Sequence, residues 1–231
     1  MNLSPNRLNI SEGNETIAWF SYFYASLFAV AIIVALVGNA LVISSFILSK
    51  KLRTKTNYFV LNLAVADLFT AVVMVFFIYT TLVKVDPTHA SNVCITQFMT
   101  ARFFTSYSLQ TLALIAINRW VLTTRSANTY KKIYRRRHIA IMILFSFAFS
   151  LGVSITPVLR GYFKYSFNER FHFCSIIRNS EVNFMVRLSL LPYFILMVVT
   201  ILCCYGSIFK QYRSSQMKVG TTSTGVWTLS R

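Results

Sequence analysis

The stretch CITQFMTARFFTSYSLQTLALIAINR, from Cys94 to Arg119, decides the fold of this chain. It is mostly apolar, with a cysteine at its first position and an arginine at its last. As an α-helix rising about 1.5 Å per residue it is roughly 37 Å long, enough to cross a hydrocarbon layer about 30 Å thick with some tilt. A disulfide-capable residue on one side of a bilayer and a fixed charge on the other indicate a transmembrane signalling element.

The rest of the chain contains further apolar runs of similar length. They are residues 16–49, 56–83, 139–159 and 188–209. Asp67 in the second of them is the one charged residue that they contain. Each run is long enough to span a bilayer as a helix, which satisfies every backbone polar group internally. The sequence therefore predicts an all-α fold, a polytopic membrane helix bundle with five transmembrane helices.

Composition and motifs exclude several other classes of protein. The 231 residues are 55% hydrophobic and 13% charged, against about 25% charged for soluble domains. The net charge of +17 is clustered between the apolar runs, which indicates membrane topology and no nucleic-acid binding. The sequence has no glycine-rich phosphate loop, HExxH motif or nucleophile elbow, and its three histidines are scattered. We therefore expect neither an enzyme nor a metalloprotein.

The distribution of charge predicts the orientation. The segments after the first, third and fifth runs contain fifteen basic residues and no acidic one, so the amino terminus is expected outside the cell. Asn9 and Asn14 begin glycosylation acceptor triplets in that outer segment. We predict an extracellular glycosylatable tail over 1–18, transmembrane helices over 19–213, and a cytoplasmic loop or loose tail over 214–231. The expected location is the plasma membrane, which the chain crosses several times.

Two ionisable residues lie inside the apolar runs. Asp67 is costly in a bilayer and is by default a functional-site hypothesis. It is either a protonated or hydrogen-bonded acid that joins helices, or a site for a cation or water, with oxygen partners from Asn39 and Ser108 that would suit sodium. Arg102 either extends toward the outer interface or contacts an anionic ligand.

With these residues in hand, the chain resembles the rhodopsin-like (class A) family of G-protein-coupled receptors over its five helices. The strongest match is NYFVLNLAVADL, Asn57 to Leu68, which is similar to the second-helix pattern of the family. Gly38-Asn39 matches the pair in the first helix, and Pro157 matches the proline in the fourth. Cys94 and Arg119 have the spacing of the family's disulfide cysteine and the arginine of its Asp-Arg-Tyr motif.

The resemblance implies transmembrane signal transduction from an extracellular ligand to a heterotrimeric G protein. It implies the following residue roles: G-protein coupling by Arg119 with its neighbours Asn118 and Trp120; a disulfide between Cys94 and Cys174; an allosteric sodium ion held by Asp67, Asn39 and Ser108; and ligand contacts at Ala101, Arg102 and Thr105. No other cofactor is expected. Arg102 and the basic outer loop favour a peptide or an acidic small molecule as the ligand.

Two departures from the family pattern leave an alternative open. Asn118 stands where the family has an acid, so Arg119 lacks a charge-assisted partner there. The residues after Tyr212 are too polar for a sixth or seventh helix. The alternative is a truncated, non-signalling membrane protein that pairs with full-length receptors and modulates them. A channel or transporter is a third interpretation, with Asp67 and Arg102 as its path residues.

Overall fold

The computed structural model describes residues 5–82, 87–161, 164–168, 173–177 and 180–226. Side chains are described for residues 19, 22–23, 25–79, 92–161 and 191–216. The elements are, in chain order, α1 (Pro5–Leu48), the 3-10 turn η1 (Lys50–Leu52), α2 (Lys55–Leu82), α3 (Pro87–Thr124), α4 (Ala127–Ile133), α5 (Arg136–Leu159), β1 (Lys164–Asn168), β2 (Phe173–Ile177) and α6 (Ser180–Val226). The predicted all-α membrane bundle is confirmed.

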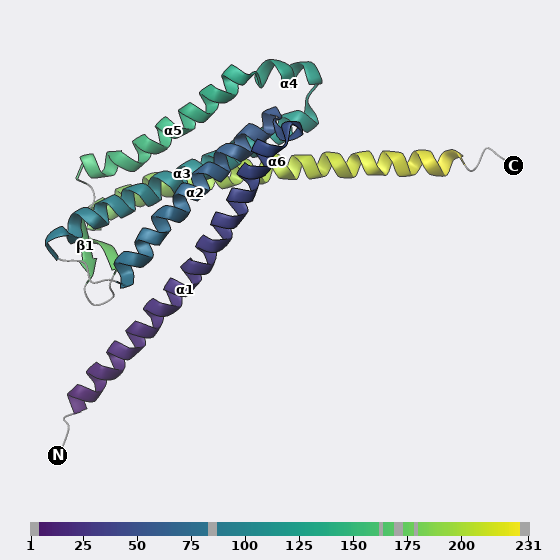
Figure 1. Ribbon diagram of the computed structural model, residues 1–231. Helices are drawn as coiled ribbons and strands as arrows, with labels where there is room; N and C mark the ends of the chain where they lie inside the picture. Colours follow the sequence, from purple (N-terminus) through teal and green to yellow (C-terminus); the bar gives the residue numbers. More distant parts are fainter. Residues whose placement is uncertain (1–4, 83–86, 162–163, 169–172, 178–179, 227–231) are drawn as a thin grey trace.

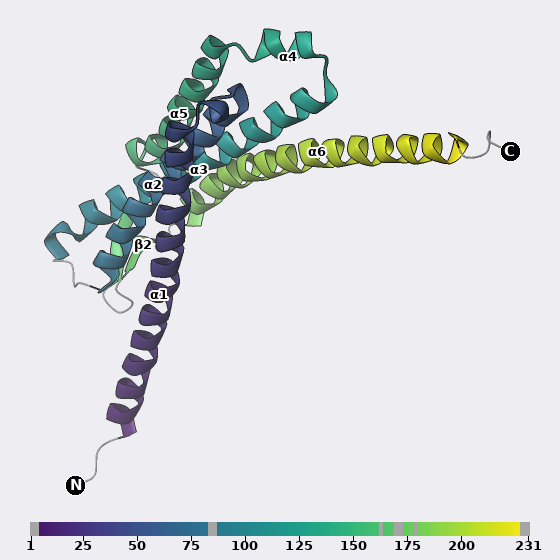
Figure 2. The same ribbon diagram turned by 45° about the vertical axis from the view of Figure 1, so that its right-hand side comes forward.

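Helix α3 lies at the centre of this bundle. It packs against α2, α5 and α6, while the half of α1 nearer η1 packs against α2 (Figures 1 and 2). The amino-terminal part of α1 and the carboxyl-terminal part of α6 project beyond the bundle in both views. The helices α2, α5 and α6 therefore all contact α3. These contacts position the residues of the candidate site.

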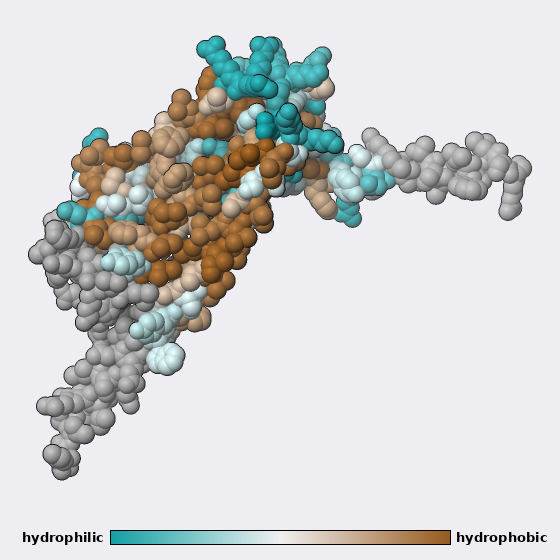
Figure 3. All heavy atoms as spheres, in the orientation of Figure 1, coloured by the Kyte–Doolittle hydropathy of each residue, from teal (hydrophilic) through white to brown (hydrophobic). Residues whose placement is uncertain are grey.

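Four helices are long and apolar enough to cross a membrane. Their candidate spans are Ala25–Leu48, Lys55–Tyr79, Arg136–Leu159 and Leu191–Gln216. Large apolar side chains are exposed along these spans, for example Leu144 and Phe145 on α5, and they form a continuous apolar band in Figure 3. Such a surface is suited to lipid, because a soluble monomer rarely exposes apolar patches larger than a few hundred Å².

The predicted span from Cys94 to Arg119 has a lower mean hydropathy than these four candidate spans and is not among them. It lies within α3, where Ser106, Gln110, Thr111 and Asn118 are all buried. These polar side chains face neighbouring helices rather than lipid, so a central helix tolerates them where a lipid-exposed one would not. Five helices thus form the bundle, but only four of them carry the hydropathy of a candidate span in the described residues.

Two features differ from the sequence-based expectation. Polar composition predicts a loop or loose tail over 214–231, yet α6 continues as a helix to Val226. Helical hydrogen bonds are local, and no proline interrupts them after Pro192, so polar composition alone does not end the helix. The connection between α5 and α6 contains an antiparallel hairpin of β1 and β2. The apolar runs of the sequence predict helices and give no indication of this hairpin.

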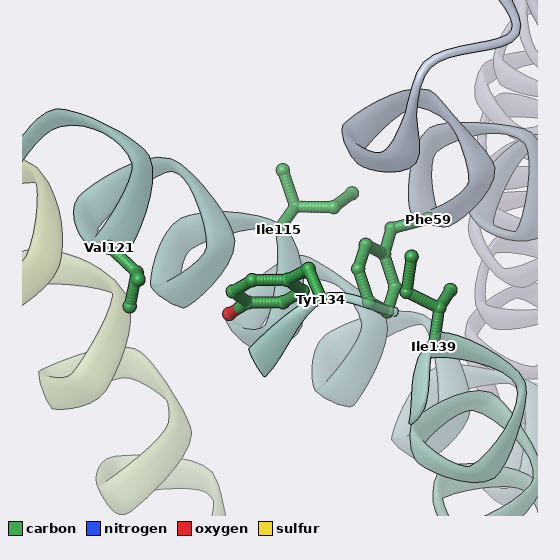
Figure 4. Packing of buried hydrophobic residues seen from close by; sticks show 5 residues of the cluster. All are labelled: Phe59, Ile115, Val121, Tyr134 and Ile139. Carbon is green, nitrogen blue, oxygen red and sulfur yellow. The ribbon is translucent and has the colours of Figure 1, made fainter. Parts of the chain in front are cut away.

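A compact apolar cluster joins α2, α3 and the start of α5. Its buried members are Phe59, Ile115, Val121, Tyr134 and Ile139 (Figure 4). The rings of Phe59 and Tyr134 meet edge to face, with centroids 6.3 Å apart and planes at 90°, a favourable arrangement for aromatic pairs. The cluster fixes the junction between α4 and α5 next to the end of α3.

Candidate functional site at the end of the central helix

The predicted coupling residues lie at the carboxyl-terminal end of α3. Asn118 is completely buried and Arg119 is exposed. Trp120 is half-buried, and the Arg125 guanidinium lies 5.4 Å from the centre of its ring. The asparagine therefore faces the bundle, while the adjacent arginine is presented outward at the same end of the helix.

A tyrosine of α4 is the hydrogen-bond partner of Asn118. Asn118 Nδ2 donates to the Tyr130 hydroxyl at 3.4 Å, and this hydroxyl shares a second hydrogen bond of 3.3 Å with Thr56 Oγ1 at the start of α2. The ammonium of Lys55 lies 5.9 Å from the centre of the Tyr130 ring, within range of a cation–π interaction. Tyr130 thus links α2, α3 and α4, a role that sequence analysis did not assign.

Tyr134 completes this polar group from the α4–α5 junction. Burial raises the pKa of Tyr134 to about 12, although a hydrogen bond with Asn118 acts in the opposite direction. Asn118 Oδ1 remains buried without a hydrogen-bond partner among the described residues, which leaves one acceptor open next to two tyrosines. At the other end of α4, the Ser126 side chain caps the helix by accepting from the Thr129 amide at 3.4 Å.

The structure brings together part of the predicted sodium set. Ser108 Oγ donates to Asp67 Oδ1 at 2.9 Å, which joins α2 to α3. Asn39 Nδ2 instead donates to Ala35 O of its own helix at 2.9 Å. Hard cations require several oxygen ligands; Asp67 and Ser108 bring two of the predicted oxygens together, and the sodium site stays a prediction.

Arg102 contacts another helix of the bundle. Its Nη2 donates to Val153 O of α5 at 3.2 Å. Pro157 lies four residues after Val153 inside α5, and a proline has no N–H to donate to that carbonyl. Arg102 therefore satisfies a carbonyl that the proline leaves without its helical partner. Of the other predicted ligand contacts, Ala101 is partly buried and Thr105 is exposed.

Small polar residues connect α3 to α5 along a seam. Ser146, Ser150 and Ser154 recur every four residues of α5 and are buried, with exposed fractions of 4%, 0% and 1%. Their size allows close approach of the two helices. Gln110 Nε2 donates to Ser150 Oγ at 2.6 Å, and Ser154 Oγ donates to Met99 O at 2.5 Å. The four-residue repeat was readable in the sequence, but its partners were not.

Helix α6 joins the same network. The hydroxyls of Tyr193 and Ser106 share a hydrogen bond of 3.1 Å, and Ser106 also accepts from Gln110 Nε2 at 3.4 Å. Near the coupling residues, Gln211 Nε2 donates to Thr123 O at 3.2 Å. This carbonyl lies in the last turn of α3, where backbone carbonyl groups have no N–H partner within the helix. Side-chain hydrogen bonds thus hold α6 to α3 at two levels.

The remaining predicted residues lie at the edge of the described structure. Cys94 is buried and disulfide-bonded, while Cys203 and Cys204 are free. The backbone of Cys174 pairs with Phe167 in the hairpin, and β1 lies against α3. The side chain of Cys174 is outside the described residues, so the pairing with Cys94 stays a prediction. Asn9 and Asn14 fall in α1, and their side chains are likewise not described.

Comparison with known proteins identifies the class of this membrane bundle. A family model described as "7 transmembrane receptor (rhodopsin family)" matches residues 38–227. The chain belongs to the rhodopsin family of seven-transmembrane receptors, which confirms the predicted family and the expectation that it is not an enzyme. The fold is similar to that of squid rhodopsin, with a TM-score of 0.69, 21% identity, and coverage of 89% of this chain and 59% of that one.

Two relatives share about a quarter of their aligned residues with this chain. The chain is 26% identical over 202 residues to the G-protein coupled receptor moody of Drosophila pseudoobscura pseudoobscura, covering 87% of this chain and 30% of that protein. It is 26% identical over 219 residues to the Adenosine receptor A3 of Ovis aries, covering 93% and 68%. The chain thus spans about a third of the first of these relatives and about two thirds of the second.

Proposed function

We propose that this chain is part of a receptor that carries a signal from an extracellular ligand to a heterotrimeric G protein. The observation that carries the proposal is the arrangement at the end of α3: Arg119 is exposed, and the buried Asn118 beside it bonds to Tyr130. An exposed cation on a helix end whose backbone is held by neighbouring contacts is suited to contact a protein partner, because the backbone of the contact surface is already ordered before binding.

The proposed orientation places this end of α3 in the cytoplasm and the amino terminus outside. The charge bias across the loops supports it, and plasma-membrane localisation follows from an extracellular ligand. In this arrangement residues 1–18 precede the bundle outside the cell, and residues 214–231 lie in the cytoplasm. Glycosylation at Asn9 and Asn14 and a Cys94–Cys174 disulfide belong to the same proposal.

Asn118 gives the coupling end a distinctive electrostatic character. An asparagine is neutral, so Arg119 has no carboxylate beside it, and α3 contains no acidic residue at all. In such a site the arginine is held by no ion pair within its own helix and is available to an incoming partner. We therefore propose that the receptor has ligand-independent activity.

The ligand is proposed to be a peptide or an acidic small molecule that reaches the outer part of α3. Arg102 supplies positive charge there, but its guanidinium also serves Val153 O. Ala101 and Thr105 lie beside it on the same helix. Since an aspartate is absent from this part of α3, a ligand whose main anchor is an amine is disfavoured.

Nucleotide exchange by a purified heterotrimeric G protein tests the proposal. The protein in phospholipid nanodiscs is expected to accelerate exchange, and Arg119→Ala is expected to abolish the acceleration. Arg213→Ala is the matched control, because it removes an exposed cation of α6 and leaves Arg119, Asn118 and Trp120 unchanged. Equal exchange rates with and without the protein would refute coupling. Intracellular retention of a co-expressed full-length receptor would instead support the modulator alternative.

A further inference from the structure

Five cations are gathered at the junction between α4 and α5. They are Lys131, Lys132, Arg135, Arg136 and Arg137, and all five are exposed. We call this group the basic rim. Figure 3 shows hydrophilic side chains gathered above the apolar band, where α4 and the start of α5 lie. The basic rim belongs to this hydrophilic region and lies directly beside the apolar surface.

No acidic side chain in the described part of the structure neutralises the basic rim. No aspartate or glutamate occurs between Asp86 and Glu169. Among the residues with described side chains the one acid is Asp67 of α2, which accepts a hydrogen bond from Ser108. Arg136 and Arg137 also open α5, where the helix dipole favours anions over cations. Helix stability therefore does not explain the placement of these charges, and they repel one another until an external anion binds.

The cations are held on a fixed scaffold. Tyr134, in the middle of the segment, is 3% exposed, and its ring stacks on that of Tyr130 with centroids 5.0 Å apart. His138 Nδ1 forms a hydrogen bond of 2.9 Å with Ile133 O, which ties the start of α5 to the end of α4. The side chains of the basic rim thus project from a backbone anchored in the apolar cluster of Figure 4.

The position along α5 sets the basic rim at the level of lipid headgroups. The candidate span begins at Arg136, and Ile141, Leu144 and Phe145 expose apolar side chains on the turns that follow. A lipid molecule that contacts these apolar side chains carries its headgroup to the cations. Clusters of four to eight basic residues immediately beside a transmembrane helix are typical of binding to anionic lipids.

We propose that the basic rim binds the headgroup of a multiply phosphorylated inositol lipid in the cytoplasmic leaflet. Several phosphates on one headgroup engage several fixed cations at once, whereas singly charged lipids would have to be collected one by one. Guanidinium groups bind phosphate in a bidentate manner, and three of the five cations are arginines. The inference relies on the proposed orientation but not on G-protein coupling.

The test measures lipid binding by the full chain in nanodiscs of phosphatidylcholine. Nanodiscs contain either a bisphosphorylated inositol lipid or phosphatidylserine at matched total charge, and bound lipid is counted by native mass spectrometry. The wild-type chain is expected to retain the inositol lipid preferentially. Since each basic residue near the surface contributes about fivefold, the triple change Arg135→Gln, Arg136→Gln and Arg137→Gln is expected to weaken retention by at least about tenfold.

A matched triple variant controls for net charge. Lys50→Gln, Lys51→Gln and Lys210→Gln remove the same number of exposed cations from the same side of the bundle. Because these cations lie on η1 and α6 and not at the α4–α5 junction, retention is expected to fall clearly less than in the rim variant. Circular dichroism and the thermal midpoint report folding. Should the rim variant not fold, Lys131→Gln with Lys132→Gln in α4 takes its place, with an expected loss of at least about fivefold.

Three outcomes would overturn the proposal. They are equal retention of phosphatidylserine at matched charge, equal loss in the control variant, and binding of purified G protein to the basic rim with no lipid retained. Failure of the proposed function is distinguishable, because Arg119→Ala is expected to abolish nucleotide exchange and leave lipid retention unchanged.

Discussion

The contact between Arg102 and α5 yields a sharp prediction about stability. Arg102→Ala removes the donor to Val153 O, which lies 3.2 Å from Nη2. Because Pro157 has no N–H, that carbonyl then has no helical partner. Pro157→Ala supplies an N–H four residues after Val153, so the carbonyl no longer depends on the arginine. The two substitutions are therefore expected to be coupled.

The magnitude follows from the nature of the bond. Leaving a buried carbonyl unsatisfied costs about 1–3 kcal/mol, while hydrogen bonds between membrane helices average about 0.6 and reach about 1.7 kcal/mol. We expect Arg102→Ala to destabilise the chain by about 1–2 kcal/mol when Pro157 is present. In the Pro157→Ala background the same change is expected to cost less than about 0.5 kcal/mol, the usual limit of additivity.

Unfolding of the chain in lipid bicelles measures all four members of this double-mutant cycle. Arg102→Lys is the control that keeps the positive charge without the planar guanidinium, and we expect it to retain only part of the stability. An equal cost of Arg102→Ala in both backgrounds would refute the reasoning. A variant with unchanged stability but impaired ligand binding would assign Arg102 to the ligand alone.

Three further predictions concern the interior of the bundle. Ser150→Ala removes the 2.6 Å bond from Gln110 and is expected to cost about 0.6–1.7 kcal/mol in bicelle unfolding. Asn118→Asp is expected to lower ligand-independent nucleotide exchange by giving Arg119 a carboxylate neighbour, and unchanged or raised exchange would contradict this. The raised pKa of Tyr134 means that its neutral form is favoured in the folded state; this stability is complete below about pH 10, the ordinary tyrosine range, and is lost as the pH rises toward about 12. Tyr134→Phe is expected to remove that loss in a pH series of melting curves.

The helices and one of the polar pairs were predictable from the sequence. Long apolar runs predict spans because lipid requires locally satisfied backbones. The depth of Asp67 and Ser108 within their runs was sufficient to predict that they lie together, and their oxygens are 2.9 Å apart. Asn39 was predicted at a similar depth but faces its own backbone. Depth along a helix is readable from sequence, whereas rotation about the helix axis depends on packing.

Other contacts depended on residues far apart in the chain. In the sequence Arg102 is only a charge within an apolar run. The carbonyl that it satisfies is open because of a proline that lies 55 positions further on in a different helix. Tyr130 and Tyr134 occur in a basic, polar segment without an apolar run, so no periodic signal indicated that they contact Asn118 and Phe59. Such partners become apparent only once the packing of α2, α3 and α5 is known.

The polar character of α3 has a consequence for how the chain is made. A helix that carries Arg102, Gln110 and Asn118 is a poor substrate for insertion on its own, because such residues oppose transfer from the translocon to lipid. Its partners on α5 and α6 are synthesised after it, and only α2 is available beforehand. We infer that α3 stays in contact with the insertion machinery or with α2 until Ser150 and Tyr193 emerge. The central helix of the finished protein therefore gains its full set of partners only after α5 and α6 have been synthesised.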